Sequence, residues 1–113
     1  MEDRNESDFE VATARDGERL TVAPAGELDL ATVPDVEAAL RGAEPAPGQV
    51  VLDLSAVTFM DTSGLRLVLE EEKRAAERGS SFLIVPGPPS VQRIFELSGV
   101  ADRLPFAPAD DGS

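Results

Sequence analysis

The order of apolar and polar positions along the chain predicts an opening hairpin. Residues 9–14 and 20–28 alternate apolar with polar side chains, and Asp16-Gly17 between them is a strong turn signal. Alternation with a period of two is typical of strands that bury one face, so we expect two antiparallel strands here. Pro24 in the second stretch indicates a bend or an edge position.

A helix is expected directly after the hairpin. Thr32 stands at the expected N-cap, Pro34 falls in the first turn, and apolar residues recur at helical spacing as far as Gly42. The Pro- and Gly-containing segment 43–48 cannot continue this helix. Residues 49–54 then form a run rich in Val and Leu, which predicts a central strand.

A second helix is predicted over residues 63–78, after a connector at 55–62, and Gly79 ends it. Its expected apolar stripe consists of Leu65, Val68, Leu69, Ala75 and Ala76. Glu72 falls inside that stripe with no evident reason, and Leu67 falls opposite it. We therefore expect Leu67 to be an exposed apolar contact for a partner.

The last part of the chain predicts a further strand and a third helix. Residues 81–85 form the strand, and the helix spans 90–98, with Ser90 as its cap and Gly99 as its stop. Leu104 and Phe106 suggest a short final strand. Strands that alternate with helices predict an α/β fold, in which helices pack on a mixed sheet of four to five strands.

The length of 113 residues fits one domain, which we place at residues 9–106. The ends at 1–8 and 107–113 are acidic and lack apolar periodicity, so we expect them to be flexible. No apolar run is long enough to span a bilayer. We therefore expect a cytoplasmic protein that does not bind membranes.

Charge and missing residue types exclude many functions. Ten Lys and Arg against 22 Asp and Glu give a net charge of −12, which disfavours binding to nucleic acid. The chain has no Cys and no His, so thiolate catalysis, Ser-His-Asp catalysis and the commonest metal ligands are excluded. We expect no catalytic residue, no metal and no cofactor.

The segment Asp61-Thr62-Ser63-Gly64 has the greatest chemical potential, because it stands where a helix begins. Unpaired N–H groups and the helix dipole accept an anion at such a position. A phosphate on Ser63 would fit there, with Gly64 leaving the first turn open. The same residues allow a purely structural interpretation, in which Thr62 or Ser63 is the N-cap and Asp61 a first-turn carboxylate.

Asp29 and Asp53 raise the possibility of a phosphoaspartate receiver, because both could lie near strand ends. Such a site also needs a lysine after a late strand, and none follows residues 81–85. We therefore expect Asp53 to end its strand as a hydrogen-bond acceptor and Asp29 to fix the turn before the first helix.

Three segments together resemble one family. The run V-V-L-D-L-S-A-V-T-F-M-D-T-S-G-L at 50–65, G-E-L-D-L-A-T-V-P at 26–34 and V-Q-R-I-F-E-L-S-G-V at 91–100 resemble the STAS family. The match is to its small single-domain anti-sigma factor antagonists, and it covers nearly the whole chain outside the ends. The resemblance implies the STAS fold.

The resemblance also implies a switch on Ser63. In this family the unmodified protein binds an anti-sigma factor serine kinase and thereby frees the sigma factor. The kinase phosphorylates the serine from ATP and breaks the complex, and a serine phosphatase that acts on phospho-Ser63 restores it. The chain would then be a substrate and ligand rather than an enzyme, and a monomer when free.

We expect the partner-binding residues to surround Ser63. They are Asp61, Thr62, Gly64, Leu65, Arg66, Leu67 and, from the G-E-L-D loop, Asp29. The alternative is a STAS scaffold or small-ligand-binding module in which Ser63 is an unmodified helix cap. A serine at this position favours the switch, because Asp or Asn would cap a helix equally well.

Overall fold

The computed structural model describes residues 8–108. This part of the chain forms a mixed five-stranded sheet and three helices, which confirms the predicted α/β fold. The expected flexible ends, at 1–7 and 109–113, lie outside the described residues. The elements are β1 (Glu10–Asp16), β2 (Arg19–Leu28), α1 (Val33–Arg41), β3 (Gln49–Asp53), β4 (Val57–Met60), α2 (Thr62–Arg78), β5 (Ser81–Val85) and α3 (Pro89–Leu97).

Strand β2 is the centre of the sheet. The strand order is β1-β2-β3-β5, and β4 pairs with the far end of β2. The predicted hairpin of β1 and β2 is antiparallel, whereas all other pairings are parallel. Pro24 lies between the part of β2 that pairs with β3, which ends at Val22, and the part that pairs with β4, which begins at Gly26. Its missing N–H therefore falls where β2 changes its parallel partner.

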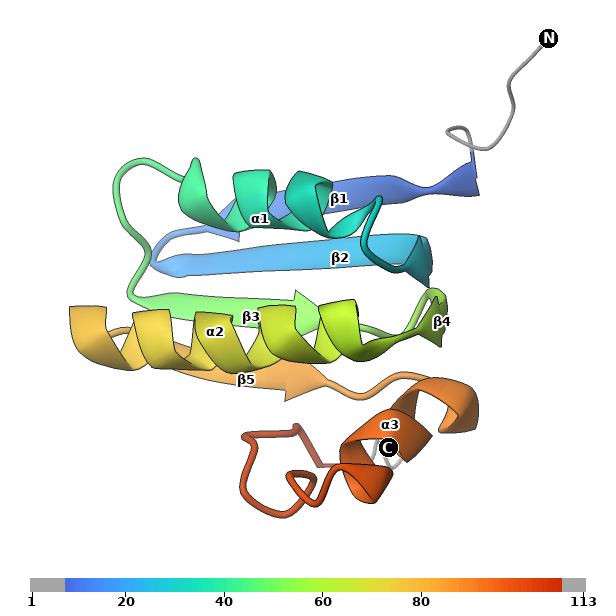
Figure 1. Cartoon of the computed structure of the whole chain (residues 1–113). Coiled ribbons are helices and arrows are strands. Elements are labelled where there is room, and N and C mark those ends of the chain that lie inside the picture. The colour runs from blue at the N-terminus through green and yellow to red at the C-terminus, as the bar shows by residue number, and fades with distance from the viewer. Residues whose placement is uncertain (1–7, 109–113) are drawn as a thin grey trace, which may run out of the picture.

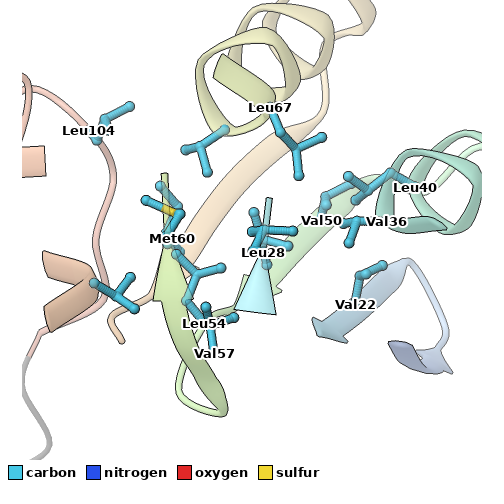
Figure 2. Packing of buried hydrophobic residues seen from close by; sticks show 14 of the residues in the cluster. Val22, Leu28, Val36, Leu40, Val50, Leu54, Val57, Met60, Leu67 and Leu104 are labelled. Atoms are coloured by element: carbon cyan, nitrogen blue, oxygen red, sulfur yellow. The ribbon is translucent and has the colours of Figure 1, made fainter. Parts of the chain in front are cut away.

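Helices α1 and α2 lie side by side on one face of the sheet, and α3 lies beyond β5 (Figure 1). The core fills the space between these helices and the sheet. Figure 2 shows Leu67 of α2 pointing into the same cluster as Val50 of β3 and Leu40 of α1. All three side chains are at most 2% exposed, so the two helices and the sheet share one apolar core.

The buried face of α2 differs from the predicted stripe. The residues that α2 buries are Gly64, Leu67, Val68, Glu71 and Ala75. Leu67 is 2% exposed, so the expectation of an exposed partner contact is wrong. Glu72 lies half-buried at the side of the helix and pairs with Arg103 at 3.2 Å. The predicted stripe differs from the buried face because two of the buried positions carry residues that do not read as apolar, the glycine Gly64 and the glutamate Glu71.

The start of α1 matches the prediction, but its cap does not form as expected. Thr32 is the residue before α1 and makes no side-chain bond to the helix. Its Oγ1 donates to the carbonyl oxygen of Glu27 at 2.8 Å and accepts from Asp29 N at 2.9 Å. The hydroxyl therefore closes the loop between β2 and α1 instead of capping the helix.

Helix α3 begins one residue earlier than predicted. Pro88 is its N-cap residue and Pro89 its first residue, so the expected cap at Ser90 is wrong. A proline fixes φ near its helical value and its missing N–H costs nothing in a first turn, which is why the helix can start there. Gly99 follows the helix with φ of 76°, in agreement with its predicted role as a stop.

Two smaller predictions need correction. Residues 57–60 form strand β4 rather than part of a connector, and only pairing with β2 defines this strand. The expected final strand is reduced to a single bridge between Phe106 and Ile84. Phe106 packs edge-to-face on Phe95 with ring centroids 5.1 Å apart, which holds the end of the described chain on the core.

Candidate functional site

Asp61 is the N-cap of α2, so the interpretation of Thr62 or Ser63 as the cap is wrong. Asp61 has an extended backbone, and its Oδ1 accepts from Ser63 N at 2.9 Å. Ser63 is thus the second residue of the helix and is half-buried. Within residues 8–108 its hydroxyl makes no hydrogen bond, which leaves Oγ available to react or to bind.

Gly64 serves the packing of α2 rather than the openness of its first turn. A Cβ on this residue would lie 2.4 Å from Met60 Cγ and 3.3 Å from Leu28 Cδ2. A Cβ at such distances would force the Met60 side chain to shift, so glycine lets α2 approach β4 this closely without displacing it. Gly64 and Leu67 therefore lie inside the molecule, and neither is available to a partner.

Ser63 lies in a surface cleft of about 440 Å³ between the starts of α1 and α2. We call it the Ser63 cleft. The residues that line it are Leu30, Val33, Pro34, Glu37, Thr62, Ser63, Arg66 and Glu70. Three of the predicted site residues, Thr62, Ser63 and Arg66, are brought together here. Leu65 is half-buried against the core and does not line the cleft.

Leu30 is the functional candidate that sequence reasoning missed. It is 78% exposed and lines the Ser63 cleft. The sequence signal for this exposed residue is a leucine in the middle of a polar turn. That turn separates a strand from a helix, so Leu30 cannot belong to the buried face of either element.

Asp29 holds the loop that carries Leu30. Its Oδ1 accepts from Ala31 N at 3.1 Å and from Thr32 N at 3.2 Å, which confirms its predicted role in the turn. Asp29 does not line the Ser63 cleft but a neighbouring cleft of about 460 Å³, on the β4 side of the same loop. Its effect on the Ser63 cleft is therefore through the position of Leu30.

The remaining acidic candidate has a structural role. Asp53 is the last residue of β3, and its Oδ1 accepts from Ser55 N at 2.9 Å, as expected for a strand end. In the described part of the chain, no group of three or more His, Cys, Asp or Glu residues is placed to hold a metal ion. None of the helices between residues 8 and 108 is both long enough and apolar enough to cross a membrane.

Comparison with known proteins connects this geometry to a family. The family profile described as Mlab, STAS domain matches residues 11–106. The anti-sigma-B factor antagonist of Listeria monocytogenes is 32% identical over 91 residues, which are 80% of this chain and 80% of that protein. Such names describe regulators and not enzymes, in agreement with the function class expected from the sequence.

Solved structures give the same result. An anti-sigma factor antagonist from Mycobacterium paratuberculosis matches with a TM-score of 0.76 and 27% identity, over 88% of this chain and 86% of that chain. The Bacillus cell fate determinant SpoIIAA in its phosphorylated form shares the fold, with a TM-score of 0.66 and 23% identity over 88% and 90% of the two chains. Since profile, relative and fold agree over most of its length, the chain belongs to the STAS domain family.

Proposed function

We propose that this protein is an anti-sigma factor antagonist, which in its unmodified form binds an anti-sigma factor serine kinase and so releases the sigma factor. Phosphorylation of Ser63 breaks this complex. The observation that carries the proposal is the placement of Ser63. Its hydroxyl is unbonded within residues 8–108 and lies in a surface cleft beside the exposed Leu30. The names of the relatives support it.

The Ser63 cleft has the composition of a protein-binding surface. Leu30 provides an exposed apolar anchor, and Val33 and Pro34 extend the apolar surface toward α1. Anchors of this kind carry much of the affinity in protein complexes when polar groups surround them. Hydrogen bonds from Asp29 and Thr32 hold the Leu30 loop in place, so the anchor is ordered before the partner arrives.

The covalent step is a phosphoryl transfer. The γ-phosphoryl group of ATP bonds to Ser63 Oγ, the hydroxyl proton leaves, and ADP is the second product. A serine phosphatase reverses the modification by hydrolysis, which returns the hydroxyl and releases inorganic phosphate. The kinase and the phosphatase perform both reactions, and this chain supplies only the acceptor.

The phosphate acts on binding rather than on the fold. It adds about −1.5 to −2 charges at the start of α2, where the helix dipole tolerates an anion. In the bound state the same group would have to lose its water against an apolar partner surface beside Leu30. Desolvation of a charged group costs several kcal/mol, and each 1.4 kcal/mol weakens binding about tenfold.

The test uses purified full-length protein and the anti-sigma factor kinases of its host. Mass spectrometry after incubation with ATP should place the phosphate on Ser63, and Ser63→Ala should abolish it while Thr62→Val does not. In calorimetry, Ser63→Asp should weaken binding to the kinase at least about tenfold. Ser55→Asp adds the same charge in the exposed turn after β3, outside the cleft, and should bind as the wild type does.

Two results would contradict the proposal. One is phosphate on Thr62 alone, and the other is equal affinity of the wild type and a folded Ser63→Asp variant. Either result would make Ser63 an ordinary first-turn residue and favour an unmodified STAS scaffold.

A further inference from the structure

Arg66 is the one cationic residue among those that line the Ser63 cleft. It follows Ser63 by three residues on α2, so the two side chains lie on the same face of the helix, one turn apart. Arg66 is exposed, and within residues 8–108 its guanidinium forms no ion pair. Its charge is therefore available at the place where the phosphate would be added.

The other charged groups around Ser63 are acidic. Glu37 of α1 and Glu70 of α2 line the same cleft, and the carboxylate of Asp61 caps the helix. Glu37 already has a partner, because Arg41 lies 3.7 Å from it. A phosphate dianion on Ser63 would thus stand among three carboxylates, with Arg66 as its single counter-ion in the cleft.

Two amides at the start of α2 are already occupied, and one of them is Gly64 N–H, which donates to the carbonyl oxygen of Asp61 at 3.0 Å. Ser63 N–H, one of the amides that a helix offers to an anion, already donates to Asp61 Oδ1 at 2.9 Å. A phosphate on Ser63 would have to displace that carboxylate or find another donor. The guanidinium of Arg66 offers a planar pair of N–H groups that matches two phosphate oxygens.

We propose that Arg66 captures the phosphate of phospho-Ser63 within the same helix. This inference rests on the phosphorylation of Ser63 proposed above and adds the residue that receives the modification. The captured phosphate stays in the cleft and covers the surface that the unmodified protein presents to its partner. Arg66 is a positioning residue for the modified state and takes no part in phosphoryl transfer.

The test places phosphoserine at position 63 during translation of the full chain, so no kinase is needed. ³¹P NMR then follows the second pKa of the phosphate, which is about 6 in an unperturbed phosphoserine. The variants are Arg66→Ala, Arg66→Lys and, as a control, Arg78→Ala, which removes an exposed arginine from the last turn of α2. Glu37, Glu70 and Asp61 are present in every variant, so the variants differ only in the cation that is removed or replaced.

A nearby cation stabilises the dianion, so Arg66 should lower the second pKa of the phosphate. We expect this pKa to lie about 0.5 lower in the wild type than in Arg66→Ala, with Arg66→Lys between them and Arg78→Ala equal to the wild type. Equal values in the wild type and a folded Arg66→Ala would overturn the proposal, as would an equal change in Arg78→Ala. Since the phosphate is supplied without a kinase, this result is independent of whether any kinase modifies or binds the protein.

Discussion

At the scale of single residues, Gly64 determines how close α2 comes to β4. Gly64→Ala would place a Cβ 2.4 Å from Met60 Cγ, in a part of the core where Met60 is 4% exposed. Overpacking of this kind costs about 1–3 kcal/mol, whereas alanine gains up to about 1 kcal/mol in helix propensity. We expect a net loss of about 1 kcal/mol in the free energy of unfolding, measured by urea denaturation.

A second variant isolates the cause. Met60→Ala removes the two atoms closest to the new Cβ, Cγ and Sδ, and leaves Leu28 Cδ2 at 3.3 Å, so Gly64→Ala should cost less in that background. If Gly64→Ala costs the same with and without Met60, the loss does not come from this contact.

Some residues of the site could be predicted from the sequence, and others could not because their roles depend on tertiary structure. Ser63 and Arg66 could be predicted, because the local D-T-S-G signature and the helix that follows it place both near one helix end. The place of Leu30 beside Ser63 could not, because it results from a loop that Asp29 and Thr32 close by hydrogen bonds, although a leucine in a polar turn does signal exposure. Nor could Gly64, whose meaning depends on Met60 of the unpredicted strand β4.

At the scale of elements, α2 carries a carboxylate on its buried face. The Glu71 side chain is 1% exposed, Oε1 lies 3.4 Å from Arg74 Nε, and Oε2 has no hydrogen-bond partner among the described residues. Arg74 thus pairs with Glu71, three residues before it on the same helix. An apolar side chain in place of a poorly satisfied buried charge often stabilises a protein by about 1–4 kcal/mol.

We therefore expect Glu71→Leu to raise the free energy of unfolding, measured in urea at pH 7. Glu72→Leu is the matched control, because the neighbouring carboxylate is 28% exposed and its pair with Arg103 should be worth at most about 1 kcal/mol. A loss of stability in Glu71→Leu well beyond that of Glu72→Leu would contradict the expectation, since it would mean that the carboxylate is well satisfied.

Elements whose ends are marked by local chemistry could be predicted from the sequence. The predicted turn forms one residue later than expected, at Gly17 and Glu18 between the paired Asp16 and Arg19, with Gly17 at φ of 62°. Gly79 takes the left-handed conformation that ends α2, with φ of 77°. Strand β4 could not be predicted, because its four residues become a strand only through pairing with β2. The prediction of the buried face of α2 was wrong for a related reason, since α1 and the sheet together determine which side of the helix is covered.

At the scale of the whole molecule, the net charge of −12 works against compactness. The three ion pairs found between residues 8 and 108 all include an arginine at least 34% exposed, so they offset little of this repulsion. At 0.1 M salt, the repulsion between exposed charges more than about 10 Å apart is largely screened. We expect the free energy of unfolding to rise by about 1 kcal/mol between low salt and 0.5 M NaCl at pH 7.

Urea denaturation at several NaCl concentrations would measure this effect, with sucrose as a control that adds solute without ionic strength. A stability that falls as NaCl rises would contradict the expectation, because it would mean that attractive pairs outweigh the surplus of acidic charge.

Both walls of the Ser63 cleft are attached to the same end of β2. The Leu30 loop leaves β2 directly after Leu28, while Leu28 pairs with Met60 of β4 and its carbonyl oxygen accepts from Asp61 N at 3.4 Å. The walls are therefore held at a fixed separation, and binding needs no rare open state whose low population would reduce the affinity. In the proposed switch, phosphorylation of Ser63 would then weaken partner binding directly, with no slower conformational change between the two events. In that proposal, the time for which the protein stays inactive equals the lifetime of a single phosphoester bond, and the proposed phosphatase sets that time.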